Sequence, residues 1–218
     1  QKFYIRNFGC QMNKLDPSLV NSALIDNGFT PTEKITDADI IILNTCSIRQ
    51  RAEEKVLSTL GHIKHLKKKN LRITTAVIGC MAQRMGSQLL EDDIVDIVAG
   101  PGQIAQLNQM LNDTISSRHK HLAITEKIRS KVTPDEMAEL DDFEYTYDSD
   151  KNHIHGQAFV RAMRGCNQFC TYCIVPYVRG PEASRSPKAI IEQVKKLAGN
   201  GITQITLLGQ TINSYNYA

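Results

Sequence analysis

The sequence lacks a hydrophobic run long enough to cross a membrane. A transmembrane helix needs roughly 18 or more consecutive apolar residues, and no apolar run in these 218 residues approaches that length. The first ten residues also lack the basic start and the long apolar stretch of a signal peptide. We therefore expect a cytoplasmic protein with no membrane-spanning segment.

The expected cytoplasmic location bears on the chemical role of the six cysteines, because the cytoplasm is reducing. Disulfides are rare in the cytosol, where cysteines more often bind metals or carry out chemistry. The even number would otherwise allow disulfides, and closely spaced cysteines also occur in zinc knuckles. None of the six histidines has metal-ligand spacing to a cysteine, so we expect the histidines at the surface.

The formal net charge is +3, but acidic residues are concentrated in one stretch. Residues 132–150 contain eight acidic side chains and no lysine or arginine, which leaves +11 on the remainder. A basic surface suits a polyanion such as RNA. A modest excess of positive charge is also common on ordinary soluble proteins.

Three cysteines lie close together in residues 164–185, RGCNQFCTYCIVPYVRGPEASR. Cys166, Cys170 and Cys173 have the spacing C-x3-C-x2-C, and no fourth cysteine follows. Ferredoxins use four cysteine thiolates for a four-iron cluster. Three thiolates leave one iron of such a cluster open to an outside ligand. An open coordination position is typical of a catalytic metal site.

The first half of the chain alternates between strand-like and helix-like patterns. Residues 39–44, DIIILN, form a continuous apolar run, which is typical of a parallel strand buried on both faces. Asp16 and Pro17 resemble an N-cap and a first helical position. The alternation predicts an α/β fold with a doubly wound, flavodoxin-like or Rossmann-like parallel sheet of about five strands. The predicted strands are 2–8, 29–33, 39–44, 72–78 and 94–99, and the predicted helices are 16–27, 48–68, 82–91 and 103–112.

The other three cysteines each follow a predicted strand of that sheet. Cys10, Cys46 and Cys80 come after the first, third and fourth strands. These strands are neighbours in the order 2-1-3-4-5, and ligands of open α/β sheets bind beyond the carboxyl ends of strands. A single cysteine there is often an ordinary buried residue, but three in succession predict a shared site.

The second half begins with a charged region. Residues 114–152 show no core-like periodicity and predict an interdomain linker with extended or partly ordered segments. A strand at 157–163, a helix at 187–200 and a strand at 204–208 follow. We therefore expect an amino-terminal domain at 1–113, the linker at 114–152 and a second domain at 153–218.

The cysteine motifs resemble a known family. C-x3-C-x2-C with Tyr172 just before the last cysteine is similar to the signature of radical S-adenosylmethionine (SAM) enzymes, and FCTYCIVPYVRG narrows the resemblance to the methylthiotransferases. GCQMN, NTCSIR and GCMAQR resemble the amino-terminal domain of that family. The resemblance implies two [4Fe-4S] clusters and SAM as cofactors. The ligands that the resemblance implies are Cys166, Cys170 and Cys173 for the SAM-binding cluster, and Cys10, Cys46 and Cys80 for an auxiliary cluster.

The second half also resembles the start of the partial (β/α) barrel of radical SAM enzymes. Cys166 then lies at the carboxyl end of a barrel strand, where barrel active sites are found. The family continues with further barrel strands and a small RNA-binding β-barrel, which the sequence does not contain. We expect a fragment whose barrel portion is inactive alone.

Other residues receive expected roles from the same resemblance. In that family the aromatic residue packs near the SAM adenine, so we expect Tyr172 there. Gln210, at the end of a predicted barrel strand, is a further candidate for a SAM contact. Three more residues are candidates for binding SAM or phosphate, although charged loop residues are also often solvated: Arg179, Ser184 and Arg185.

The implied reaction is methylthiolation of C2 of N6-isopentenyladenosine in tRNA. Gln11, Met12 and Asn13 favour this tRNA enzyme over the branches that act on a ribosomal protein or on threonylcarbamoyladenosine. The same residues would also suit a turn and a helix cap. The expected partners are tRNA and an external electron donor of the flavodoxin or ferredoxin type, and we expect a monomer. A non-enzymatic iron–sulfur electron-transfer or scaffold protein is the alternative from another class.

Overall fold

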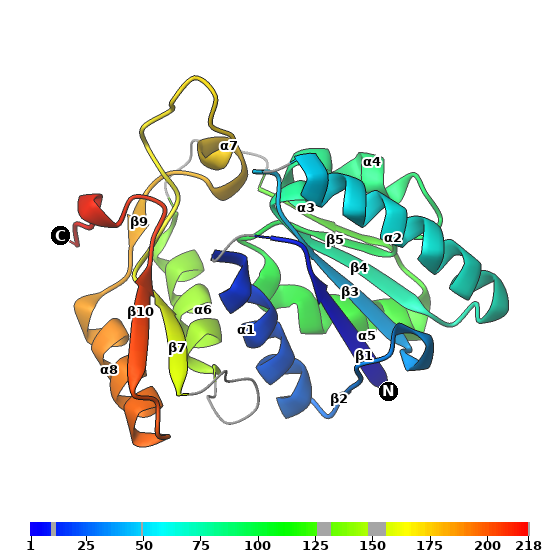
Figure 1. Ribbon diagram of the computed structural model, residues 1–218, viewed down its shortest axis with the longest axis horizontal. Helices are drawn as coiled ribbons and strands as arrows, with labels where there is room; N and C mark the ends of the chain where they lie inside the picture. Colours follow the sequence, from blue (N-terminus) through cyan, green and yellow to red (C-terminus); the bar gives the residue numbers. More distant parts are fainter. Residues whose placement is uncertain (10–11, 49, 126–131, 148–155, 218) are drawn as a thin grey trace. The chain divides into compact units, whose positions relative to one another are not determined.

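The computed structural model describes residues 1–9, 12–48, 50–125, 132–147 and 156–217 (Figure 1). The chain divides into two compact units, Gln1–Glu126 and Lys127–Ala218. Each unit has its own sheet, so the two are considered separately.

The first unit contains a six-stranded parallel sheet in the order β2-β1-β3-β4-β5-β6. This order confirms the predicted doubly wound fold and adds one strand. Every residue of β3 and β4 is buried, because helices cover both faces of a parallel sheet. The strands are β1 (Lys2–Asn7), β2 (Thr30–Pro31), β3 (Ile40–Thr45), β4 (Thr74–Gly79), β5 (Ile97–Ala99) and β6 (His121–Ala123).

Two layers of helices enclose this sheet (Figure 1). On one face, Val56 and Ile63 of α2 pack with Ile41 and Leu43 of β3 in the main hydrophobic core. On the other face, α1 contacts α5 as well as the strands. The helices are α1 (Met12–Asp26), α2 (Gln50–Lys69), α3 (Cys80–Met85), α4 (Ser87–Leu90) and α5 (Leu107–Ser117), with short 3-10 turns η1 (Ile35–Asp37) and η2 (Ile104–Gln106).

Three of the predicted helices differ from the structure. The helix predicted at 103–112 is α5, which spans Leu107–Ser117 and follows the turn η2. Helix α1 begins at Met12, before the predicted start at Asp16, and it contains Pro17 in its interior. Pro17 is the sixth residue of this helix and has no backbone N–H to donate to the preceding turn. The predicted helix at 82–91 is two short helices, because the chain breaks at Gly86, which has a φ of 51°.

The region predicted as a charged linker contains regular structure. It holds the end of α5, the strand β6 and the helix α6 (Pro134–Tyr145). A capping box begins α6: the amide of Glu136 donates to Thr133 Oγ1 at 3.2 Å, and the amide of Thr133 donates to Glu136 Oε2 at 2.8 Å. Strand β6 pairs with β5 through only three residues, a length too short for sequence periodicity to reveal.

The second unit contains the expected strand–helix–strand arrangement. Strands β7 (Gln157–Arg161) and β10 (Gln204–Leu208) pair in parallel, and α8 (Pro187–Gly199) connects them. Ser186 caps α8 by accepting a hydrogen bond from the amide of Ala189 at 3.1 Å. Ile191 of this helix is 51% exposed. The remaining elements are β8 (Met163–Arg164), β9 (Ala183–Ser184), α7 (Val175–Arg179) and η4 (Ile212–Ser214).

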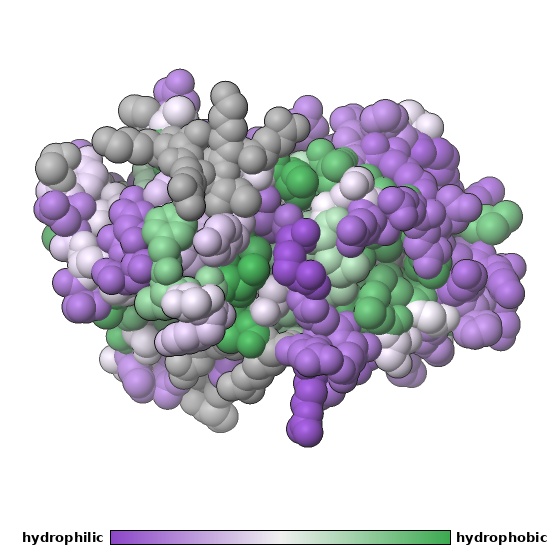
Figure 2. Space-filling model, turned by 90° about the horizontal axis from the view of Figure 1, so that it is seen from above, coloured by the Kyte–Doolittle hydropathy of each residue, from purple (hydrophilic) through white to green (hydrophobic). Residues whose placement is uncertain are grey.

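The surface is consistent with the composition. The face shown in Figure 2 carries mostly hydrophilic residues with smaller apolar patches between them. Scattered apolar residues of this kind are normal on protein surfaces. Among the described residues, no helix combines the length and the hydropathy needed to cross a membrane.

Candidate functional site

Two of the scattered cysteines lie at one edge of the first sheet. In the pairing of β3 with β4, Thr45 is opposite Gly79. Cys46 and Cys80 are the next residues along these two parallel strands, so they lie at neighbouring carboxyl ends. Both side chains are buried. Cys10, predicted to join them after β1, lies outside the described residues, as does Gln11.

The backbone at this edge requires a glycine. Gly79 has a φ of +95°, and a Cβ at this position would lie 2.5 Å from the carbonyl oxygen of Thr45. The Thr45 hydroxyl donates to the carbonyl of Ile78 at 2.6 Å. The Asn44 amide donates to Asn7 Oδ1 at 3.1 Å. These contacts fix the ends of β1, β3 and β4 against one another.

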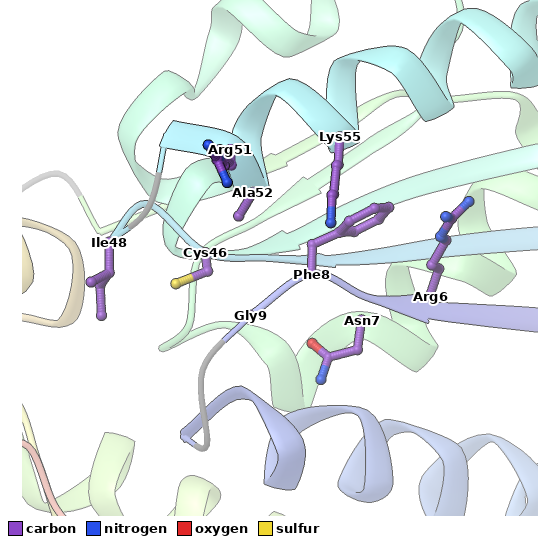
Figure 3. A pocket seen from close by; sticks show the side chains of 9 residues that line it. All are labelled: Arg6, Asn7, Phe8, Gly9, Cys46, Ile48, Arg51, Ala52 and Lys55. Atoms are coloured by element: carbon purple, nitrogen blue, oxygen red, sulfur yellow. The ribbon is translucent and has the colours of Figure 1, made fainter.

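A cavity of about 370 Å³ opens beside Cys46 (Figure 3). Its lining comes from the end of β1, the residues after β3 and the first two turns of α2. In Figure 3 the Lys55 side chain runs from α2 toward the Phe8 ring, while Cys46 lies past the end of β3. The lining residues are Arg6, Asn7, Phe8, Gly9, Cys46, Ile48, Arg51, Ala52 and Lys55.

The other three cysteines lie in one loop of the second unit, between β8 and α7. Cys166 is buried, Cys170 is exposed and Cys173 is half-buried, and all three are free thiols. The Cys166 amide donates to the carbonyl of Gly180 at 3.1 Å, and the Cys173 amide donates to the carbonyl of Cys170 at 2.9 Å. Cys166 is thus fixed at the root of the loop, while Cys170 faces solvent.

The two ends of this loop are held close together. Gly165 has a φ of +69°, and a Cβ there would collide with the carbonyl oxygen of Pro181. Asn167 and Glu182 exchange hydrogen bonds: the Asn167 amide donates to Glu182 Oε1 at 3.2 Å, and the Glu182 amide donates to Asn167 Oδ1 at 3.1 Å. The loop therefore begins and ends at one tightly closed neck.

Sequence reasoning missed one neighbour of the cysteine loop. Thr211, which precedes η4, has its hydroxyl oxygen 3.1 Å from the sulfur of Cys166. The hydroxyl does not cap η4. Forty-five residues separate the two positions, and no local pattern could have indicated the contact.

The predicted SAM-side residues have different environments. Tyr172 is 92% exposed, and Arg179 is half-buried at the end of α7. Ser184 Oγ accepts a hydrogen bond from the Asn216 amide at 3.1 Å. The amide oxygen and nitrogen of Gln210 are both buried, and neither has a hydrogen-bond partner among the described residues. Such a group is costly unless something else satisfies it.

Arg185 lies in the interior and was predicted to bind SAM or phosphate. It is 1% exposed, and its guanidinium binds Asp141, the carbonyl of Arg161 at 2.7 Å and Gln193 Oε1 at 2.8 Å. Gln193 in turn donates to the carbonyl of Glu144 at 2.8 Å. These contacts argue against the predicted ligand contact and give Arg185 a structural role.

Glu144 is the centre of this buried network. It is fully buried, and its Oε1 accepts hydrogen bonds from Arg161 Nη1 and Arg164 Nη2, each at 2.7 Å. Arg185 Nη1 lies 3.9 Å from the other carboxylate oxygen. Arg164 immediately precedes the neck of the cysteine loop. The network therefore attaches α6 to the strand and turn that carry Cys166.

The chemistry of the cysteine loop suits an iron–sulfur cluster, whose ligands are thiolates. Three free thiols lie within eight residues of one loop with a closed neck, and a hydroxyl adjoins one of them. Within the described ranges, no three Cys, His, Asp or Glu side chains are already grouped as metal ligands. The residues fit the cluster by donor type and sequence spacing.

Two models of known families match this chain, one in each half. Residues 2–100 match the family described as Uncharacterized protein family UPF0004. Residues 160–217 match the Radical SAM superfamily. The two matches follow one another along the chain, and residues 101–159 lie between them.

Three curated relatives share one name, tRNA-2-methylthio-N(6)-dimethylallyladenosine synthase. The relative from Dictyoglomus thermophilum is 43% identical over 98% of this chain and 46% of its own length. That from Desulfotalea psychrophila is 41% identical over 99% of this chain and 46% of its own. That from Porphyromonas gingivalis is 37% identical over 100% of this chain and 45% of its own. The chain thus spans a little under half the length of these relatives.

Proposed function

We propose that the chain is part of a radical SAM methylthiotransferase that modifies C2 of N6-isopentenyladenosine in tRNA. The main support for the proposal is that two features occur together in one chain. A cysteine loop in a radical SAM domain occurs together with two buried cysteines at one sheet edge of an UPF0004 domain. The names of the relatives support tRNA as the substrate.

In this proposal Cys166, Cys170 and Cys173 hold a [4Fe-4S] cluster with one iron left for SAM. When bound, the cluster and SAM supply a radical that can remove hydrogen from a strong C–H bond. The protein positions the ligands. The buried Cys166 anchors the loop, and the exposed Tyr172 is available to pack on the SAM adenine.

Gln210 is the SAM contact with the most support from the structure. It follows β10, whose carboxyl end lies beside that of β7 in the parallel pair. Its buried amide lacks a partner within the described part of the chain. A polar ligand in this position would satisfy both amide atoms, which are a donor and an acceptor. Arg179 and Ser184 remain candidates for SAM or phosphate contacts.

A second [4Fe-4S] cluster on Cys10, Cys46 and Cys80 would be the source of the transferred sulfur. Support comes from the neighbouring positions of Cys46 and Cys80 at the ends of β3 and β4. Strand β1, which leads to Cys10, pairs with β3 on its other side. The proposed auxiliary site therefore draws on three adjacent strands, each ending at the same edge of the sheet.

The proposal also covers the partners of the protein, its cellular location and its oligomeric state. The target base must leave the stack to reach a buried site, and an electron donor of the flavodoxin or ferredoxin type must reduce the SAM-binding cluster. We propose a cytoplasmic monomer.

The test is to incubate the whole protein of which this chain is proposed to be part, reconstituted with iron and sulfide, with SAM, a reductant and an isopentenylated tRNA anticodon stem-loop. We expect 5′-deoxyadenosine and a methylthiolated nucleoside, both measured by mass spectrometry. Cleavage of SAM without modification of this RNA would contradict the assigned substrate. No cleavage of SAM by the cluster-loaded whole protein would contradict the radical mechanism.

A further inference from the structure

The cavity beside Cys46 has a cationic lining. Arg6 comes from β1, and Arg51 and Lys55 come from α2. Arg51 and Lys55 are four residues apart, so they lie on the same face of the helix. No described residue that lines the cavity is acidic.

These three cations also lack counter-charges. Within the part of the chain that the structure describes, Arg6, Arg51 and Lys55 form no ion pair with an acidic side chain. Other cations of the same unit are paired: Lys67 lies 2.5 Å from Asp96, and Arg84 lies 2.7 Å from Glu53. Positive charge is therefore concentrated around this cavity, and no described acidic side chain pairs with it.

The rest of the lining suits a ligand that is only partly charged. The Arg6 guanidinium lies 5.0 Å from the centroid of the Phe8 ring, a distance at which cation and ring attract each other. Ile48 is 53% exposed at the opposite side of the cavity, and Asn7 adds an amide. The volume of about 370 Å³ falls in the range of about 300–1,000 Å³ for small-ligand sites.

We infer that this cavity binds a phosphate group of the RNA backbone, with Arg6, Arg51 and Lys55 as its ligands. The inference rests on the proposed function. A nucleotide that is flipped out turns about its backbone, so the phosphates beside it move with the base. A base presented to a sulfur site at Cys46 would bring a flanking phosphate to this edge of the sheet. Lysine and arginine supply the charge that such a contact needs.

The test compares two charge-matched double variants of the whole protein of which this chain is proposed to be part, each reconstituted with its clusters. Arg51→Gln with Lys55→Gln removes two cations of the cavity. Lys64→Gln with Lys68→Gln removes two exposed cations of the same helix outside the cavity. The affinity for an isopentenylated anticodon stem-loop is measured by fluorescence anisotropy between about 50 and 200 mM salt, where phosphate contacts change affinity most clearly.

We expect the cavity variant to bind more weakly at low salt, and its plot of log K against log salt to be less steep by about one. The control variant should keep the slope of the unmodified chain. Equal slopes for the cavity variant and the unmodified chain would overturn the inference. A reduced slope in both variants would also overturn it, because the effect would then be that of general surface charge.

A second arm separates the possible sources of the phosphate. Inorganic phosphate is titrated against the unmodified chain, with the RNA absent and then present. If inorganic phosphate displaces the RNA no better than any other salt does at the same ionic strength, that result supports a site for the RNA backbone. Saturable binding of inorganic phosphate that leaves the slope of log K against log salt unchanged for the RNA would overturn the inference. The cavity would then be a site for a free anion. Methylthiolation is measured separately, so an altered slope without product would contradict the proposed function and leave the phosphate contact standing.

Discussion

The hydroxyl oxygen of Thr211 lies 3.1 Å from the sulfur of Cys166. In the free thiol either atom can donate the hydrogen bond. A cysteine that binds iron is a thiolate without a proton, so only the Thr211 hydroxyl can then donate. Hydrogen bonds to cluster sulfurs are among the factors that set the reduction potential. The contact therefore links a residue after β10 to the redox behaviour of the proposed SAM-binding cluster.

Replacing Thr211 with valine should make the reduction potential of that cluster more negative. Valine keeps the shape of threonine but removes the donor that stabilises the electron-rich reduced state. Thr211→Ser keeps the hydroxyl and should restore the potential. A redox titration followed by electron paramagnetic resonance measures this directly. Identical potentials for the valine variant and the unmodified chain would show that the hydroxyl does not act on the cluster.

Replacing Gln210 with leucine should weaken SAM binding about tenfold, the effect of losing a hydrogen bond worth about 1.4 kcal/mol. Equilibrium dialysis with SAM on cluster-loaded protein gives the affinity. Gln204→Leu, an exposed change at the start of β10, the strand that Gln210 follows, is the control and should leave SAM binding unchanged. Unaltered affinity in the Gln210 variant would remove this residue from the SAM site.

Replacing Glu144 with glutamine should destabilise the second unit by about 3–5 kcal/mol, because the buried arginines lose their counter-charge. Arg161 and Arg164 both donate to this carboxylate. Denaturant unfolding followed by circular dichroism measures the loss. Glu139→Gln, an exposed change on the same helix, should stay within about 0.5 kcal/mol of the unmodified chain. Equal stabilities for the two variants would mean that the network contributes little.

Replacing Gly165 with alanine should prevent the cysteine loop from holding its cluster. The added Cβ meets the carbonyl of Pro181, and the positive φ adds strain. Gly199→Ala meets no atom within 4 Å and is the matched control. Iron content after anaerobic reconstitution should fall by about half in the first variant and stay unchanged in the second. Full iron content in Gly165→Ala would show that the neck of the loop tolerates a side chain.

The sequence was most informative where a pattern is local. The apolar run of β3 and the recurrence of strand and helix predicted the sheet and the neighbouring positions of β1, β3 and β4. The same order predicted that Cys46 and Cys80 follow adjacent strands. Each of these features depends on residues within one strand and the turn that follows it.

The sequence was least informative where contacts join distant segments. Glu144 lies in an acidic stretch that suggested a solvated linker, yet it is buried against arginines 17 and 20 residues further along the chain. Arg185 resembled an exposed loop cation until its partners in α6 and α8 were known. Periodicity cannot detect such pairs, because each charged residue looks solvent-exposed until its partner is placed beside it.

The most direct test of two independent clusters is the iron and sulfide content after anaerobic reconstitution. It compares the unmodified chain with Cys166→Ala/Cys170→Ala/Cys173→Ala and with Cys10→Ala/Cys46→Ala/Cys80→Ala. We predict about eight irons in the unmodified chain and about four in each triple variant, as for two separate four-iron clusters. About four irons in the unmodified chain, all lost with the loop cysteines, would contradict an auxiliary cluster at the sheet edge. Bound zinc in place of iron would contradict both centres.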